Sequence, residues 1–134
     1  MKKKPVSGAC AFCAIEPAQF LAANDLAVAI KDRYPISPGH MLIIPRRHVA
    51  NFMDATDAER DALWALVPKV MERLTKEHSP DGFNIGLNDG AAAGQTIPHL
   101  HVHLIPRYSG DQRDPRGGLR KIFLQKADYW SGKQ

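Results

Sequence analysis

Short apolar runs separated by turn-forming residues dominate the first third of the chain. Residues 26–31 and 40–45 each have the length and the β-branched content that are typical of a strand. The turn between them, with Ser37-Pro38-Gly39, is too short for a parallel crossover, so the two strands are predicted to pair antiparallel. Residues 83–87 are predicted to form a third strand.

One long helix is predicted between residues 51 and 78. Thr56 and Glu59 have the spacing of a capping box. Apolar residues then recur with helical spacing at Leu63, Leu66, Val67, Val70, Met71 and Leu74. Pro68 lies inside this pattern, and because proline has no N–H to donate, it is expected to kink or break the helix.

Residues 98–106 read Pro-His-Leu-His-Val-His-Leu-Ile-Pro and show strict alternation. Successive side chains of a strand point to opposite faces, so His99, His101 and His103 are predicted to share one face while the leucines and the valine face the core. Imidazole titrates near neutral pH and can act as base, acid, nucleophile or metal ligand. With a short strand expected at residues 121–124, the pattern predicts an α+β fold, an antiparallel sheet of about five strands with one main helix.

Composition narrows the class of protein. A chain of 134 residues with 44% hydrophobic content suits one domain with its own core. It has neither a membrane-spanning apolar run nor a signal-peptide pattern, which predicts a cytoplasmic location. The net charge of +4 is dispersed along the chain, so nucleic-acid binding is not favoured, and the phosphates of a small nucleotide fit the charge equally well.

Three segments together resemble the histidine triad (HIT) superfamily. They are the triad itself, the run Pro38-Gly39-His40 to Arg46-Arg47-His48, and the loop from Asn88 to Thr96 that directly precedes the triad. The resemblance covers about residues 10–108. Residues 1–9 are predicted to form a flexible basic leader, and residues 109–134 form either a solvated basic tail or one that folds over the substrate site. It implies a HIT-like fold, a nucleotide substrate and a homodimer.

The resemblance also implies roles for the histidines. His101, the middle one, would attack the α-phosphate of a nucleotide and form a nucleotidyl-histidine intermediate that water then hydrolyses. His103 would donate a hydrogen bond or a proton on the leaving-group side, and His40 would complete the proton network. His99 is expected to orient the site or to bind a metal.

Further residues are assigned to the substrate. Gln95 and Thr96 fall where the family places side chains that contact phosphate, and Asn88 opens the same loop. Asp32 matches the position that holds the ribose hydroxyls, since a carboxylate accepts well from a vicinal diol. Mg²⁺ is expected only as a companion of the substrate's polyphosphate.

The two cysteines, Cys10 and Cys13, form half of a tetrahedral zinc site. Family members that begin this way complete a structural zinc site with the histidines that correspond here to His48 and His99. The alternative interpretation is a pair of reduced thiols without a role. A redox dithiol is not favoured, because the strand and helix context of such motifs is absent.

Several functions stay open at the level of sequence. The loop 94–96 resembles the dinucleoside polyphosphate hydrolase branch, whereas Asp32 and the cysteine pair resemble the branch that favours nucleoside phosphoramidates. A zinc-dependent hydrolase would instead use all three triad histidines as ligands of one catalytic ion. A nucleotide-binding regulator would show little turnover.

Overall fold

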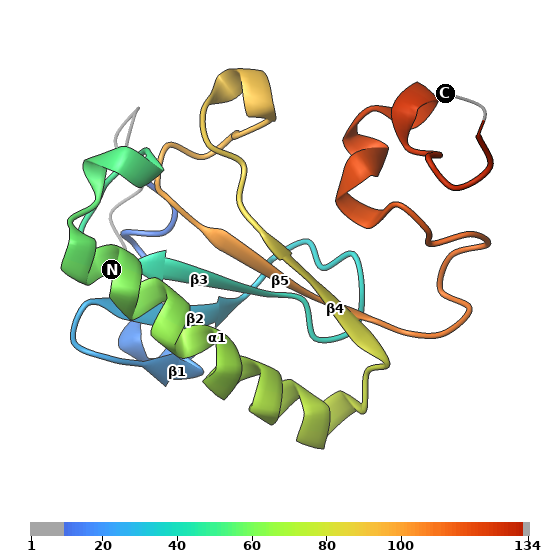
Figure 1. Ribbon diagram of the computed structural model, residues 1–134. Helices are drawn as coiled ribbons and strands as arrows, with labels where there is room; N and C mark the ends of the chain where they lie inside the picture. The colour runs from blue at the N-terminus through green and yellow to red at the C-terminus, as the bar shows by residue number, and fades with distance from the viewer. Residues whose placement is uncertain (1–9, 133–134) are drawn as a thin grey trace.

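The fold is built on one antiparallel sheet, seen in Figure 1 with a single long helix across it. The computed structural model describes residues 10–132. The strands are β1 (Ala22–Ala23), β2 (Ala27–Lys31), β3 (Met41–Pro45), β4 (Gly82–Gly86) and β5 (Val102–Arg107), in the spatial order β1-β2-β3-β5-β4. All four pairings are antiparallel, which confirms the predicted α+β class.

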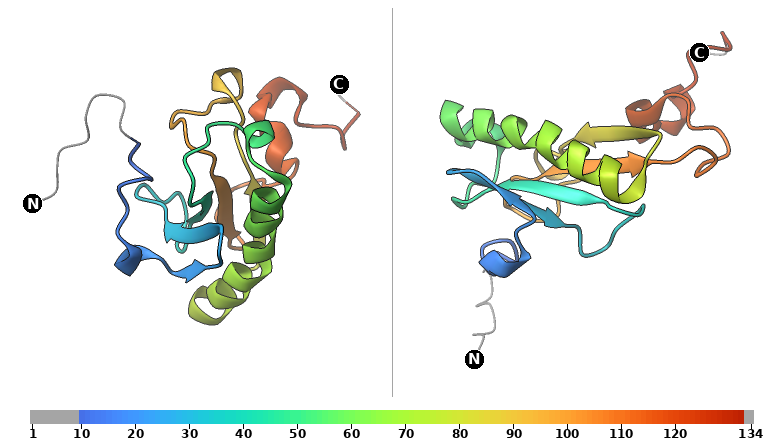
Figure 2. Two further views of the ribbon diagram at one scale, coloured as in Figure 1. Left: turned by 90° about the vertical axis from the view of Figure 1, so that its left-hand side faces the viewer. Right: turned by 90° about the horizontal axis from the view of Figure 1, so that it is seen from below.

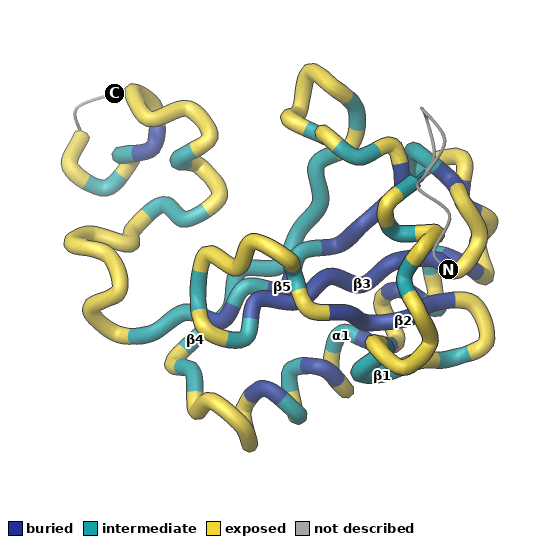
Figure 3. The backbone as a smooth tube through the Cα atoms, turned by 180° about the vertical axis from the view of Figure 1, so that it is seen from behind, coloured by how far each residue is buried: buried dark blue, intermediate teal, exposed yellow. Residues whose placement is uncertain are grey.

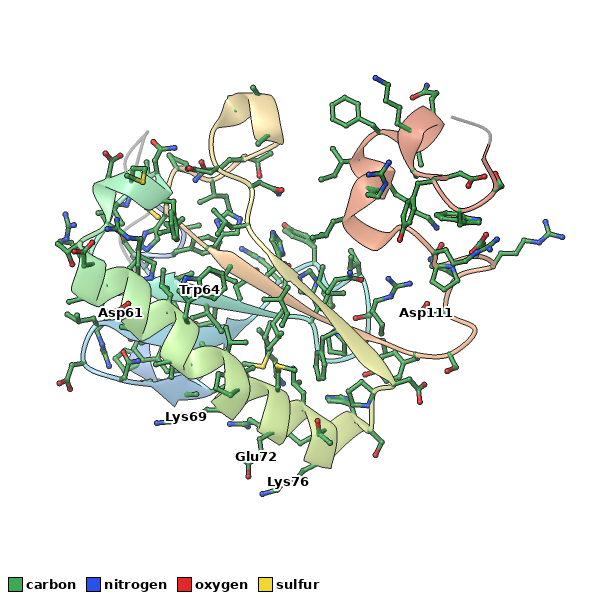
Figure 4. The ribbon with its side chains drawn as sticks, in the orientation of Figure 1. Asp61, Trp64, Lys69, Glu72, Lys76 and Asp111 are labelled. Carbon is green, nitrogen blue, oxygen red and sulfur yellow. The ribbon has the colours of Figure 1, made fainter. Side chains whose placement is uncertain are left out.

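Helix α1 (Asp57–His78) covers one face of the sheet (Figure 2). Thr56 and Glu59 form the predicted capping box, and the stripe Leu63, Leu66, Val70 and Leu74 is buried against the sheet. Figure 4 shows Lys69, Glu72 and Lys76 on the opposite, outer side of the helix. The apolar stripe of α1 thus closes one face of the sheet, while on the other face a second cluster, Val28, Ile30, Leu42 and Ile44, is buried under side chains from the N-terminal segment.

The expectation that Pro68 could break the helix was wrong. The helix runs through it from Asp57 to His78. Pro68 itself is exposed, and the buried side chains Leu66 and Val70 hold the helix to the sheet on both sides of it. Packing of the apolar stripe therefore outweighs the loss of one backbone hydrogen bond.

Two other predicted elements differ from the structure. The triad strand begins at Val102, because its pairing with β3 runs from Val102 with Ile43 to Leu104 with Met41. Residues 121–124 are not a strand. They span the junction of two 3-10 helices, η4 (Gly118–Ile122) and η5 (Leu124–Lys126). N–H groups here make local bonds such as Phe123 N to Arg120 O, because no strand within residues 10–132 pairs with this segment.

Most of the sheet is buried or half-buried, whereas most of the tail is exposed (Figure 3). All residues of β3, and all residues of β2 except Lys31, are buried. Three further 3-10 helices lie in the described chain, at Pro17–Gln19, Phe52–Asp54 and Ala91–Ala93. No helix among residues 10–132 combines the length and apolarity that crossing a bilayer requires. The predicted leader, residues 1–9, lies outside the described residues.

Candidate functional site: three histidines with three different partners

The histidines gather on the sheet face opposite α1. His99 and His101 lie in the extended segment just before β5, and His103 lies in β5 itself. His40 directly precedes β3, which pairs with β5, and this neighbourhood brings its ring to His103. His40, His99 and His101 are buried to within a few per cent of full burial, and His103 is half-buried. The environment of each imidazole is therefore fixed by the protein.

His101 has one nitrogen held by the backbone. Its Nδ1 lies 2.8 Å from the carbonyl oxygen of His99. A carbonyl can only accept, so Nδ1 carries the proton and donates, and in the neutral ring Nε2 retains its lone pair. The ring is flanked edge-on by Phe12 at 5.1 Å and by His103 at 5.2 Å between ring centroids. His101 thus presents the tautomer that a nucleophilic imidazole needs.

His40 and His103 form a directed pair. The backbone N–H of Ile36 donates to Nδ1 of His40, at 3.2 Å, so the neutral His40 ring carries its proton on Nε2. That Nε2 lies 2.9 Å from Nδ1 of His103 and donates to it. His103 then carries its own proton on Nε2, the nitrogen left for a ligand. The chain from Ile36 to His103 makes His103 a hydrogen-bond donor.

Burial keeps this pair neutral. Desolvation, followed by the proximity of His101 and His40, lowers the pKa of His103 to about 4, although the carboxylate of Asp32 acts in the opposite direction. Desolvation also lowers the pKa of His40, again against Asp32. A neutral His103 can donate a hydrogen bond without adding a second positive charge beside His101.

Asp32 lies with the histidines. Its Oδ2 is 3.3 Å from His40 Nε2 and 3.9 Å from His103 Nδ1, while its Oδ1 accepts from the N–H of Tyr34 at 2.8 Å. The sequence predicted the ribose contact, which no observation tests. The sequence did not predict that Asp32 contacts His40 and His103, because this contact depends on how β2, β3 and β5 lie side by side.

The loop before the triad is braced by two of its own side chains. The Gln95 amide donates to the carbonyls of Ala50 and Ile97, and its oxygen accepts from Gly90 N at 2.8 Å. Asp89 ties the loop to the segment before α1 by accepting from Asn51 Nδ2 and Phe52 N. The Gln95 amide can therefore donate to a phosphate only when it gives up its hydrogen bond to one of these carbonyls. Sequence reasoning missed Asp89, which has no recognisable motif.

Two other predicted substrate ligands have uncommitted side chains. Asn88 is half-buried and Thr96 is exposed. Neither makes a side-chain hydrogen bond to the rest of the described chain, residues 10–132. An amide and a hydroxyl at this end of the triad segment are thus available to a ligand.

The four predicted zinc ligands converge. The ligand atoms of Cys10, Cys13, His48 and His99 all lie within 4.8 Å of one another. Nδ1 of His99 is 3.3 Å from Sγ of Cys10 and 3.5 Å from Sγ of Cys13, and Nδ1 of His48 is 3.3 Å from Sγ of Cys13. Sulfur and nitrogen ligands of one tetrahedral zinc ion stand about 3.6 Å apart. The spacing fits zinc closely.

His99 is oriented for that role by its other nitrogen. Nε2 lies 2.8 Å from the carbonyl oxygen of Pro45, so it donates there, and the lone pair of Nδ1 faces the cysteines. Metal-bound histidines commonly donate their second nitrogen in this way. The last residue of β3 thus sets the tautomer of His99, a signal that the sequence did not contain.

A second group, Asp32, His40 and His103, also has ligand atoms within 4.8 Å of one another. Here the tautomers argue against a metal. Nδ1 of His40 accepts from Ile36, so a metal on Nε2 would require either an imidazolate or the loss of that bond. Within residues 10–132, no such group unites the three triad histidines, as the zinc-hydrolase alternative requires.

One helix covers the antiparallel sheet, and the three triad histidines have different hydrogen-bond partners. These features define a histidine triad domain. A search against protein families agrees: the HIT domain matches residues 15–110, and the chain belongs to that family.

Known proteins resemble the chain over most of its length. It is 43% identical to the asymmetrical bis(5'-nucleosyl)-tetraphosphatase of Schizosaccharomyces pombe over 126 residues, covering 87% of this chain and 69% of that protein. It is 38% identical to the bifunctional bis(5'-adenosyl)-triphosphatase/adenylylsulfatase FHIT of Arabidopsis thaliana, covering 72% of this chain and 54% of that protein. The chain thus spans about half the length of the Arabidopsis relative.

Solved structures share the fold. The crystal structure of a Zn-bound histidine triad family protein from Mycobacterium smegmatis has a TM-score of 0.70 and 32% identity, and covers 91% of this chain and 94% of that one. A HIT family protein from Bacillus anthracis also has a TM-score of 0.70, with 34% identity, covering 76% of this chain and 75% of that one.

Proposed function

We propose that this protein is an enzyme that cleaves dinucleoside polyphosphates or related nucleotide conjugates at an α-phosphate, with His101 as the nucleophile. The observation that carries the proposal is the hydrogen bond from His101 Nδ1 to His99 O, because it leaves the Nε2 lone pair for attack. Several relatives support the substrate class by name, including the S. pombe tetraphosphatase and the Arabidopsis triphosphatase/adenylylsulfatase.

The first step transfers a nucleotidyl group to the protein. His101 Nε2 attacks the α-phosphorus, an N–P bond forms, and the P–O bond to the leaving group breaks. His103 donates from Nε2–H to the departing oxygen, and Asn88 and Thr96 donate to the phosphoryl oxygens as their charge rises. Gln95 joins them by exchanging one of its two carbonyl partners for a phosphoryl oxygen. Asp32 accepts from the ribose hydroxyls. Mg²⁺ belongs to the polyphosphate substrate and needs no protein ligand.

Water completes the reaction. The water oxygen bonds to the phosphorus of the intermediate and the N–P bond breaks, so that its electron pair returns to His101 Nε2 and the ring is again neutral. The proton lost by the water passes to solvent. The named relatives include both hydrolases and an AP-4-A phosphorylase of Mycobacterium tuberculosis, so water and phosphate are the two candidate acceptors of the nucleotidyl group. We favour water, because the third triad position is His103, whereas the uridylyl- and adenylyltransferases of the superfamily have a glutamine at that position.

Steady-state rates test the substrate class. We expect the protein to cleave a dinucleoside polyphosphate to a nucleoside monophosphate, faster than it cleaves a nucleoside phosphoramidate. His101→Ala should lower kcat/KM by at least about a thousandfold, as expected for loss of a nucleophile. Nucleotide binding without turnover by the wild-type protein would support the regulator alternative and contradict the proposal.

Structural zinc is the second part of the proposal. Bound by Cys10, Cys13, His48 and His99, zinc would link the segment before the 3-10 helix Pro17–Gln19 to the residues after β3 and to the start of the triad. The similar M. smegmatis protein is described as Zn-bound, which supports the assignment. The ion would hold His99, and through the His99 carbonyl the ring of His101, without contacting substrate.

Metal analysis tests this assignment. We expect one zinc per chain in wild-type protein, a substoichiometric amount in Cys10→Ser, and an unchanged content in His40→Gln, which alters the other histidine group. Chelation should lower the Tm of wild-type protein and leave Cys10→Ser nearly unaffected. Equal zinc in Cys10→Ser and wild type would contradict the assignment, and loss of zinc in His40→Gln would move the ion to the second group.

A further inference from the structure

A groove lies beside the histidines on the same face of the sheet. Along β5 the burial alternates, so that His103, Ile105 and Arg107 share the open face while Val102 and Leu104 are buried toward α1. Ile105 and Arg107 line the groove, together with Asn84, the β4 partner of Ile105. Residues two apart on a strand are about 6.8 Å apart, so the groove begins one such step beyond His103.

Two segments form the groove walls. On one side stand residues 36–38, whose Ile36 N–H sets the tautomer of His40. On the other side stand residues 115–122 of the tail, which Figure 1 shows (orange to red) coiled beyond the ends of β4 and β5. The tail approaches the sheet closely at Gly118, where a Cβ would lie 3.4 Å from Asn84 Nδ2. Tyr108, the residue after β5, also lines the groove, and its Oη donates to Pro38 O at 2.7 Å.

The walls are apolar and open to solvent. Ile36, Leu119 and Ile122 are 74%, 60% and 75% exposed, unusually high for aliphatic side chains that all face one cavity. Pro38 and Ile105 extend the apolar lining. The groove encloses about 470 Å³, within the range of small-molecule sites. Such a surface suits a flat, weakly polar group.

Two charged residues of the groove, Arg107 and Asp111, neutralise each other. Asp111 binds Arg107 through two hydrogen bonds of 2.8 Å, and Asn84 Oδ1 accepts from Arg107 Nη1 at 2.7 Å. Lys121 donates to the backbone carbonyl of Asp114. The Asn84 amide nitrogen has no hydrogen-bond partner among the described residues and stays available as a donor. A mainly apolar lining with one free amide donor is therefore suited to a heterocycle that can accept a hydrogen bond.

We infer that this groove binds the nucleobase of the leaving nucleotide, the half of a dinucleoside polyphosphate that departs when His101 attacks. The inference rests on the proposed function for its substrate class. The polyphosphate would cross His103, and the distal base would lie between Ile36 and the tail residues Leu119 and Ile122, with Asn84 donating to a ring nitrogen. The tail then selects for substrates that carry a second base.

Binding to the full-length protein tests the groove without requiring turnover. The probes are a methylene-bridged, non-cleavable diadenosine tetraphosphate and an adenosine 5′-tetraphosphate with the same methylene bridges, which lacks the second nucleoside. The double variant Leu119→Ala/Ile122→Ala should weaken binding of the diadenosine probe about tenfold and leave the adenosine tetraphosphate affinity unchanged. Phe123→Ala is the matched control, since Phe123 is 67% exposed in the same tail but does not line the groove.

The outcomes separate the two proposals. Equal loss of affinity for both probes, no loss for either, or the same selective loss in Phe123→Ala would overturn the groove assignment while leaving the cleavage reaction intact. Selective loss in the double variant of a protein that cleaves neither substrate would uphold the groove and overturn the proposed function. Because all three substituted side chains are exposed, the variants are expected to fold.

Discussion

Each triad histidine is distinguished by the partner of one of its nitrogens. His99 gives Nε2–H to Pro45 O, His101 gives Nδ1–H to His99 O, and His103 accepts at Nδ1 from His40. The alternation of the sequence predicted that these residues act together. It could not predict their tautomers, because the partners are backbone carbonyls and a histidine of another strand. Identical side chains thus acquire different chemistry from where the fold places them.

The ionisation of His103 gives a prediction at this scale. Long-range ¹H–¹⁵N NMR should show His103 protonated on Nε2 and neutral through pH 5, titrating at about 4, where its pKa is lowered by burial and by its histidine neighbours. Because the folded pKa lies below the usual 6.5, the unfolded chain takes up this proton first, and the free energy of unfolding falls as the pH is lowered from 6.5 to 4. A midpoint near 6.5, or a proton on Nδ1, would contradict the assigned network.

Among the elements, α1 is the one that the sequence predicted best. Its capping box, apolar stripe and C-terminal end at His78 all follow from local rules. The elements that the sequence predicted poorly depend on whether a strand pairs with them. β1 exists only because Ala22 and Ala23 pair with β2, and residues 118–126 lack a strand to pair with. Local signals are sufficient for a helix with its own caps, whereas a strand needs its neighbour.

Glu59 anchors the start of α1 and provides the prediction for this element. Its buried carboxylate accepts from Arg47 and from Thr56 N, and the Arg47 guanidinium is the main reason that the pKa of Glu59 is lowered to about 2. Glu59→Gln should reduce the free energy of unfolding at pH 7 by about 1–3 kcal/mol, measured by urea denaturation.

The pH dependence of that difference follows from the sign of the shift. The stabilisation by the Glu59 carboxylate is complete above its unfolded pKa of 4.5 and is lost as the pH falls toward 2, so wild type and Glu59→Gln should converge there. Glu72→Gln is the control, because its pair with Lys76 is exposed and is worth at most about 0.5 kcal/mol. A constant difference between pH 7 and pH 2 would rule out the charged pair as its cause.

For the whole molecule, the sheet has one long side that the described chain leaves unpaired. β4 pairs with β5 on one side only, and all five of its residues are half-buried. A free edge of this kind is a template for pairing with another chain. The homodimer expected from the family resemblance would place a second copy at this edge, which is consistent with the single-sided pairing of β4.

Light scattering after gel filtration tests this assembly. A dimer should have twice the 14.8 kDa mass of the chain and dissociate only on dilution. A mass of 14.8 kDa at all concentrations would contradict the dimer, without affecting the chemistry assigned to a single chain.

The central claim is that His101 becomes covalently nucleotidylated. Mass spectrometry of protein quenched with acid-free denaturant within milliseconds of mixing with diadenosine tetraphosphate tests it most directly. We predict a transient adduct with the mass of one adenylyl group, located by peptide mapping on His101, absent from His101→Ala and more persistent in His103→Gln if the second step is also slowed. Turnover by wild-type protein with no adduct at any time point, or undiminished turnover by His101→Ala, would contradict the account.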